Sequence, residues 1–140
     1  MECEGKIIVG RDTRSTSSAL ATAVLDGIAA IGGSSVTDIG VVTTPQLHYM
    51  VVANNTDGAY GVPSLEGYYA KLTGAFNAFM ASLTDTGNYK ATIYFDGANG
   101  VGAPAMQEFA KLVKSTLDVT LVNSGIFVFL VSSSVLYVCL

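Results

Sequence analysis

Apolar residues follow two different spacings along the chain, and the changes between them predict its secondary structure. Short apolar runs rich in β-branched residues predict strands at residues 7–9, 35–39, 90–95 and 119–122. Between these runs, apolar residues recur every three or four positions. This spacing predicts helices after residue 15, from Pro45 to about Asn54, from Leu65 onward and after Pro104.

Glycine and hydroxyl residues mark the ends of the expected helices. Gly32 and Gly33 suit a left-handed end to the first helix. The threonine directly before Pro45 is expected to cap the second helix, and Ser64 is expected to cap the third. The serine cluster at residues 15–18 is expected to supply the capping oxygen of the first helix.

Two segments have the order strand, helix, strand: residues 6–39, and the residues from 90 onward. Such crossovers are right-handed and join parallel strands, so the turns at residues 10–14 and 40–45 should be neighbours at one sheet edge. The sequence therefore predicts an α/β fold with a mixed, largely parallel sheet and helices on both faces.

The turn after the first strand carries the strongest candidate for chemistry. Arg11 and Arg14 suit an anionic group such as a phosphate, with Asp12 orienting one of them, because guanidinium groups match phosphate geometry. The alternative is a structural ion pair that pins the turn to the helix. The residues alone leave both interpretations open.

Composition narrows the class of protein and its partners. Of the 140 residues, 50% are apolar and 13% are charged, which excludes a disordered chain. The net charge is −4 and no basic cluster is present, so no nucleic-acid partner is expected. Cys3 and Cys139 form neither a disulfide framework nor a zinc motif. Acidic residues stand where a signal peptide has a basic flank, so we expect a cytoplasmic protein.

For the other residues that could carry chemistry, the sequence favours structural roles. The glycine-rich turn reverses the spacing of the dinucleotide fingerprint, so a nucleotide site is disfavoured: Gly97, Gly100 and Gly102. His48 is the single histidine and has no serine at elbow spacing and no carboxylate pair, so a structural role is favoured for it. The carboxylates are too dispersed for a magnesium site: Asp85, Asp96 and Glu108.

The end of the chain is uncharged and strongly apolar. Residues 119–140 contain no charged side chain and just reach the about 20 residues that a membrane span needs, whereas residues 126–140 do not. A membrane contact through residues 119–140 is the less favoured interpretation, because Asn123, Ser124 and Gly125 interrupt the span. A buried strand and a segment foreign to the fold are the two alternatives.

Four segments, together with Ser17 and Ser18, carry a family resemblance: residues 9–14 (VGRDTR), 42–51 (VTTPQLHYMV), 65–72 (LEGYYAKL) and 96–102 (DGANGVG). They resemble the phosphoacetylglucosamine mutase family, a eukaryotic branch of the α-D-phosphohexomutase superfamily. The first segment is shared across the superfamily, and the second and third are particular to this branch. Nothing like Thr-Ala-Ser-His-Asn-Pro follows Pro45, which also agrees with this branch.

The resemblance spans about residues 6–122 and implies an interior part of such a protein. It implies that residues 1–84 are the rear part of the first family domain, that residues 85–124 begin the second, and that residues 125–140 are a hydrophobic tail foreign to the family. The phosphoserine loop is expected upstream of Met1 and the magnesium loop downstream of Val122. The resemblance therefore assigns no catalytic residue and no metal ligand here, and the family's Mg²⁺ is not expected to bind this chain.

The family interconverts N-acetylglucosamine 6-phosphate and 1-phosphate, on the way to UDP-N-acetylglucosamine. The resemblance implies a truncated mutase-like chain without activity of its own. One alternative is a non-catalytic protein that associates with the full-length mutase or with a membrane through its tail. The other is a small anion-binding α/β domain that uses Arg11, Asp12 and Arg14.

Overall fold

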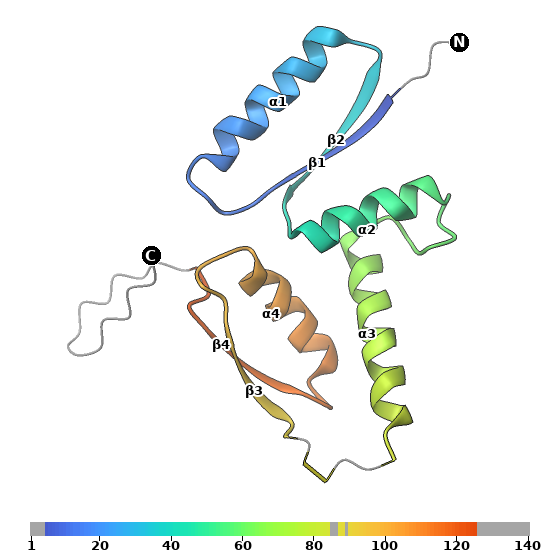
Figure 1. Cartoon of the computed structure of the whole chain (residues 1–140), viewed down its shortest axis with the longest axis vertical. Coiled ribbons are helices and arrows are strands. Elements are labelled where there is room, and N and C mark those ends of the chain that lie inside the picture. Colours follow the sequence, from blue (N-terminus) through green and yellow to red (C-terminus); the bar gives the residue numbers. More distant parts are fainter. Residues whose placement is uncertain (1–4, 85–86, 89, 126–140) are drawn as a thin grey trace, which may run out of the picture.

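Two strand–helix–strand units and two joining helices make up the structure (Figure 1). It is a computed structural model that describes residues 5–84, 87–88 and 90–125. The first unit is β1 (Gly5–Arg11), α1 (Ser17–Ile31) and β2 (Ser34–Val41). The joining helices are α2 (Thr44–Asn55) and α3 (Leu65–Ser82). The second unit is β3 (Thr92–Asp96), α4 (Gly102–Val113) and β4 (Asp118–Val122).

Each unit contains one pair of parallel strands, β1 with β2 and β3 with β4. This confirms the predicted α/β class and the parallel strands. Among the described residues the strands form two separate two-stranded sheets. The turns that follow β1 and β2 are neighbours, as predicted, since the Val42 amide donates to the Arg11 carbonyl at 3.0 Å.

Two glycines shape the end of the β1–β2 pair. The register shifts between Val9 and Arg11, where β2 carries one extra residue. Gly40 adopts a φ of 75° in that irregular stretch of β2, a conformation that side chains disfavour. A Cβ on Gly10 would lie 2.6 Å from the Val42 Cγ2 atom, so only glycine allows β1 to leave the sheet this close to β2.

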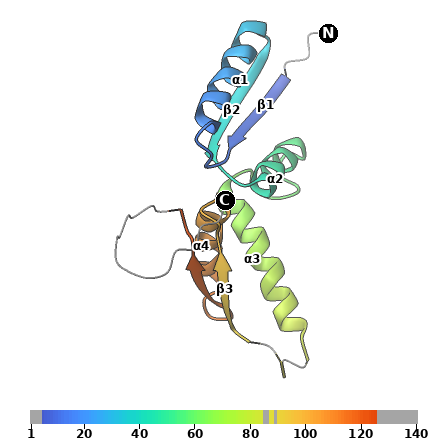
Figure 2. The ribbon, with the colours of Figure 1, turned by 60° about the vertical axis from the view of Figure 1, so that its left-hand side comes forward.

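Helices cover both faces of the β1–β2 sheet, as predicted. Ile8 packs against the buried cluster that α2 supplies: Tyr49, Met50 and Ala53. Its neighbour Val9 lines a cavity with Ala21 of α1. Successive residues of a strand point to opposite faces, so α1 and α2 lie on opposite sides of β1. The turned view in Figure 2 shows the sheet between these two helices.

Helix α3 connects the two units. It contacts α2 at its start and α4 further along, where the Phe76 and Phe109 rings meet edge to face at 5.8 Å. Tyr68 makes an edge contact with Tyr49 at 5.6 Å. Tyr68 and Phe76 are therefore packing residues, as the sequence indicated, whereas Phe79 is 61% exposed.

The observed helix ends match the predictions at three places and differ from them at two. Gly32 and Gly33 both have positive φ, and the Ser64 hydroxyl accepts a hydrogen bond from the Gly67 amide at 3.0 Å. Pro104 lies in the first turn of α4. The cap of α2 is Thr43 and not the threonine next to Pro45, because Gln46 completes a capping box with Thr43. Among the described residues, no side chain caps the start of α1.

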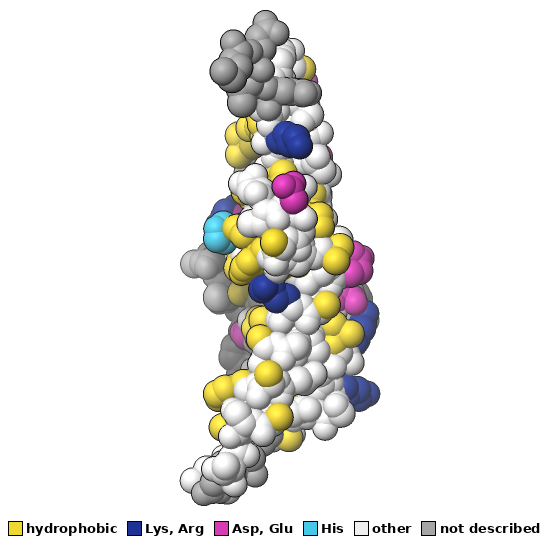
Figure 3. Space-filling model, turned by 90° about the vertical axis from the view of Figure 1, so that its right-hand side faces the viewer, with side chains coloured by type: hydrophobic (Ala, Val, Ile, Leu, Met, Phe, Trp, Pro, Cys, Tyr) yellow, Lys and Arg dark blue, Asp and Glu magenta, His cyan; other side chains and the backbone are white. Residues whose placement is uncertain are grey.

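Large apolar side chains stay exposed on both units. On α1, Leu20 is 63% exposed, Val24 49% and Ile31 87%. The face shown in Figure 3 also carries many separate hydrophobic side chains. Part of the apolar stripe of α1 is thus left uncovered by the described residues.

Several expectations fall on residues outside the described ranges. These are residues 126–140 of the membrane-contact interpretation (119–140) and of the foreign-segment interpretation (125–140), and the roles of Cys3, Asp85 and Cys139. Residues 119–122, where the uncharged stretch begins, lie in β4. In the part of the chain that the structure describes, no helix combines the length and apolarity needed to cross a bilayer.

Candidate functional site

The carboxyl ends of the two sheets face each other across the middle of the molecule (Figure 1). Thr13 from the β1–α1 turn lines one cavity with Asn99 and Gly100 from the β3–α4 turn. Val101 lines a second cavity with Arg11 and Arg14. The edge where ligands bind in open parallel sheets is therefore shared by both units.

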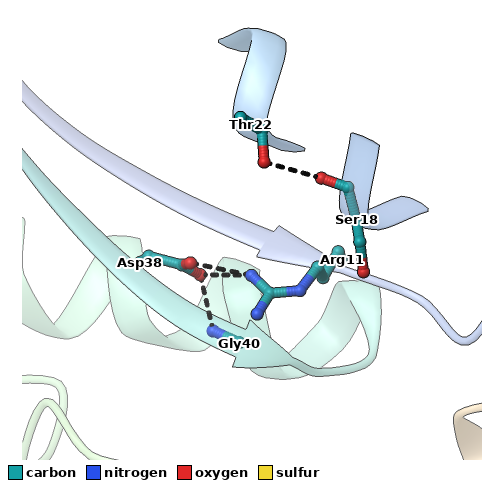
Figure 4. A network of polar contacts seen from close by, with 5 residues as sticks. All are labelled: Arg11, Ser18, Thr22, Asp38 and Gly40. Carbon is teal, nitrogen blue, oxygen red and sulfur yellow. Dashed lines mark hydrogen bonds and ion pairs between the residues drawn. The ribbon is translucent and has the colours of Figure 1, made fainter. Parts of the chain in front are cut away.

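Arg11 does not point freely into this region. Its Nη1 atom donates to both carboxylate oxygens of Asp38, at 2.8 and 2.7 Å, and Asp38 also accepts from the Gly40 amide at 2.8 Å (Figure 4). The Gly40 hydrogen bond and the Arg11 guanidinium hold the pKa of Asp38 below its ordinary value of 3.8. Arg11 thus ties β1 to β2.

Asp12 organises the turn itself. Its Oδ1 atom accepts from the Arg14 amide at 3.1 Å and from the Ser17 hydroxyl, and its Oδ2 atom accepts from Arg14 Nη1 at 2.6 Å. These contacts, the Ser17 hydrogen bond first, lower the pKa of Asp12 from 3.8 and keep it ionised. Ser17 therefore bonds back to Asp12, and it is the first residue of α1, one position after the N-cap residue Thr16.

Arg14 is the accessible cation of the site. Its side chain is 81% exposed, compared with 28% for Arg11. A guanidinium has five N–H donors, and Asp12 occupies a donor of Nη1 alone. The cavity beside it has a volume of about 540 Å³ and includes Thr16 and Ser17 at the start of α1, where the helix dipole favours anions. This arrangement can hold a phosphate-sized anion.

In the turn between β3 and α4, backbone hydrogen bonds occupy three of the amides. The amides of Gly97, Asn99 and Gly100 donate to backbone carbonyls at 2.9, 2.7 and 2.8 Å. Asp96 accepts from the Ala98 amide and from Asn123 Nδ2, which lowers the pKa of Asp96 from 3.8. These three amides already have acceptors and are therefore not free to cradle a phosphate.

The remaining candidates are dispersed. His48 is exposed on α2, beside a cavity of about 330 Å³ that Tyr49 and Tyr60 also line. Asp96 ends β3, and Glu108 pairs with Lys111 on α4 at 2.6 Å. The described residues contain no group of three His, Cys, Asp or Glu side chains that could hold a metal ion. They do not fit a magnesium site.

Sequence reasoning missed Asp38 and the pair formed by Gln46 and Tyr69. Asp38 lies 27 residues from Arg11, and only the strand register brings the two together. Gln46 is 3% exposed and its Nε2 atom donates to the Tyr69 hydroxyl at 2.8 Å. The capping-box spacing from Thr43 to Gln46 was the one available signal.

The chain is similar to sugar-phosphate mutases in sequence and in structure. Residues 1–62 match the family model described as phosphoglucomutase/phosphomannomutase, alpha/beta/alpha domain I. The human phosphoacetylglucosamine mutase is 41% identical over 119 residues, which are 85% of this chain and 22% of that protein. Phosphoacetylglucosamine mutase 2 of Schizosaccharomyces pombe is 43% identical over 127 residues, 88% of this chain and 22% of its own.

Solved structures agree. An N-acetylglucosamine-phosphate mutase of the α-D-phosphohexomutase superfamily, in the apo-form, superimposes with a TM-score of 0.75 at 35% identity, covering 87% of this chain and 25% of its own. The Aspergillus fumigatus N-acetylphosphoglucosamine mutase, in complex with GlcNAc-6P and magnesium, gives 0.72 at 35% identity, covering 85% and 24%. The chain thus spans about a quarter or less of the length of these relatives.

Proposed function

We propose, from the premise that this chain is a homologue of the phosphoacetylglucosamine mutases within the α-D-phosphohexomutase superfamily, that its β1–α1 turn binds the phosphate of an acetylglucosamine phosphate. The observation that carries this proposal is Arg14, an exposed guanidinium oriented by Asp12 at the carboxyl end of β1. A complex of a relative contains GlcNAc-6P, which identifies the class of ligand to test.

The three candidate residues have different roles in this proposal. Arg14 contacts the phosphate with the N–H donors that Asp12 leaves free. Asp12 positions Arg14 and connects it to Ser17 at the start of α1. Arg11 is a positioning residue, because its contact with Asp38 holds the two strands whose ends form the site.

The proposed domain organisation keeps the boundary given by the sequence. Residues 1–84 belong to the first family domain and residues 85–124 begin the second. The match of residues 1–62 to domain I and the new parallel pair that starts at Thr92 support this division. A cytoplasmic location is part of the proposal, supported by the absence of a disulfide framework or zinc motif in the sequence.

We also propose that the 140 residues alone do not interconvert N-acetylglucosamine 6-phosphate and 1-phosphate and bind no Mg²⁺ of their own. This proposal is supported by the small part of the family protein that the chain represents, because the matched residues are 22% of the length of the human mutase. The chain contributes a phosphate contact and relies on other parts of such a protein for the chemistry.

Titration calorimetry of the 140-residue chain with N-acetylglucosamine 6-phosphate tests the phosphate contact. Binding is expected, and Arg14→Ala should weaken it about tenfold or more, because a charge-assisted hydrogen bond is lost. Lys114→Ala is the matched control, since it removes one exposed positive charge at the end of α4. Equal weakening by both variants would mean that only net charge matters. Conversion of the sugar phosphate with Mg²⁺ present would contradict the proposed inactivity.

The exposed face of α1 favours association with a full-length mutase as a second candidate function. Leu20 and Val24 are exposed on this helix, and apolar surface of this kind marks contact sites. A tagged chain should co-purify with human phosphoacetylglucosamine mutase, and a Leu20→Asp, Val24→Asp double variant should not. Ala29→Asp, on an exposed position of the same helix, should leave the association intact. Capture that is equal for all three chains would remove this candidate.

A further inference from the structure

A second groove lies between the end of β2, helix α3 and helix α4. It has a volume of about 600 Å³, within the range of small-molecule sites. Its walls are mainly apolar and include Val41, Leu65, Ala70, Pro104 and Leu112. Val41 and Leu112 are half-exposed, so part of the wall is apolar surface left in contact with water.

Two hydrogen-bond donors lie at the polar side of this groove. The Tyr69 oxygen accepts from Gln46 Nε2 at 2.8 Å, so its own hydrogen must be donated elsewhere. No described residue is recorded as accepting it. The Gln46 oxygen accepts from the Thr43 amide and hydroxyl at 2.8 and 3.0 Å, which fixes the orientation of the side-chain amide.

Gln46 also has a spare donor. Its Nε2 carries two hydrogens, and the Tyr69 hydroxyl takes one of them. Gln46 is 3% exposed, so the second hydrogen has little access to bulk water. Buried donors without acceptors are costly, and an oxygen from a ligand in the groove would satisfy both groups.

The charges at the rim disfavour an anionic ligand. Glu66 and Glu108 both line the groove, and only Glu108 has a basic partner there, Lys111 at 2.6 Å. An anion would be repelled by the remaining carboxylate. Burial raises the pKa of Tyr69, so the hydroxyl keeps the proton that it donates.

We propose that this groove binds a small neutral molecule with an apolar body and an amide or ketone carbonyl, whose oxygen accepts hydrogen bonds from the Tyr69 hydroxyl and the Gln46 amide. The apolar body covers Val41 and Leu112. The site is separate from the proposed phosphate contact, since the lining of this groove includes none of Arg11, Asp12 and Arg14.

The test uses two probes that differ only in the carbonyl, N-phenylacetamide and N-ethylaniline, added to the ¹⁵N-labelled 140-residue chain. N-phenylacetamide should shift the amide signals of residues 65–70 and 104–112 in a saturable way. N-ethylaniline should bind about five- to tenfold more weakly, because it lacks the carbonyl oxygen that accepts from the two donors. Equal binding of both probes, or shifts confined to other residues, would overturn the proposal.

Tyr69→Phe removes one donor and keeps the ring. It should weaken N-phenylacetamide about five-fold and leave N-ethylaniline unchanged. Tyr68→Phe is the matched control, because Tyr68 lines a different cavity and is absent from the lining of this groove. Ala70→Phe fills the groove and should abolish binding of both probes. The circular dichroism of each variant reports its folding, and unchanged carbonyl preference in a folded Tyr69→Phe chain would contradict the proposal.

Discussion

Arg11 and Asp38 form a two-point contact between neighbouring strands, with Arg11 Nη1 at 2.8 and 2.7 Å from the two carboxylate oxygens. The contact crosses the register shift that Gly40 permits, and the Gly40 amide donates to the same carboxylate at 2.8 Å. The more buried arginine of the turn is therefore committed to the sheet. Arg14 remains as the arginine that a ligand can reach.

Asp38→Asn should lower the midpoint of thermal unfolding. The change removes the charge that pairs with Arg11 and leaves the guanidinium without its partner. Asp26→Asn, at an exposed position of α1, serves as the control and should change the midpoint little. A lower midpoint for the control alone would contradict the structural role of the pair.

Stability should fall at acidic pH because of three aspartates. The folded chain lowers the pKa of Asp12, Asp38 and Asp96 from 3.8. A lowered pKa means that the unfolded chain binds protons first as pH decreases. The stabilisation is therefore complete well above pH 3.8 and is lost as pH falls through the folded-state values below it. Urea unfolding between pH 7 and pH 2 measures this loss, and Asp38→Asn should make the curve flatter.

Thr43→Ala should destabilise the chain by about 1 kcal/mol, the usual effect of losing an N-cap. Thr43 accepts from the Gln46 amide and belongs to the capping box of α2. Thr44→Ala is the matched control and should stay within about 0.5 kcal/mol of the parent, since Thr44 is exposed in the first turn. Urea unfolding measures the stability of both variants. A larger loss for Thr44→Ala than for Thr43→Ala would mean that the threonine next to Pro45 is the cap after all.

Gly97→Ala should destabilise the chain by about 1–3 kcal/mol through overpacking. A Cβ at this position would lie 2.5 Å from the Ala103 Cβ and 2.9 Å from the Asn123 carbonyl oxygen. Gly27→Ala, in the middle of α1 with nothing within 4 Å, should instead stabilise by about 0.5–1 kcal/mol. Thermal unfolding of both variants checks the opposite signs, and a neutral Gly97→Ala would mean that α4 lies further from the turn.

The local parts of the fold and of the site were predictable from sequence. Strands of apolar residues, Gly32 and Gly33 after α1, Ser64 before α3 and the charged turn after β1 all depend on neighbouring residues. Such features are determined by periodicity, glycine conformation and hydroxyl caps within a few positions. The parallel pairing also followed, because a crossover through one helix has a preferred hand.

Contacts between distant positions were not predictable in this way. The serine cluster was expected to cap α1, yet the N-cap residue is Thr16, its side chain makes no cap hydrogen bond, and Ser17 donates to Asp12 five residues earlier. The sequence assigned no role to Gln46, and its contact with Tyr69 requires α3 to pack beside α2.

By itself, the sequence determined the α/β class, the parallel strands and the turn that carries Arg11, Asp12 and Arg14. Tertiary structure decided which of those charges a ligand can reach, because Arg11 pairs with Asp38, which lies 27 residues further along the chain. It also decided that the β1–α1 and β3–α4 turns line the same cavities and that a groove forms beside Tyr69. The physical reason is that periodicity reports on neighbours along the chain, whereas pairing of charges and shaping of cavities depend on strand register and helix packing.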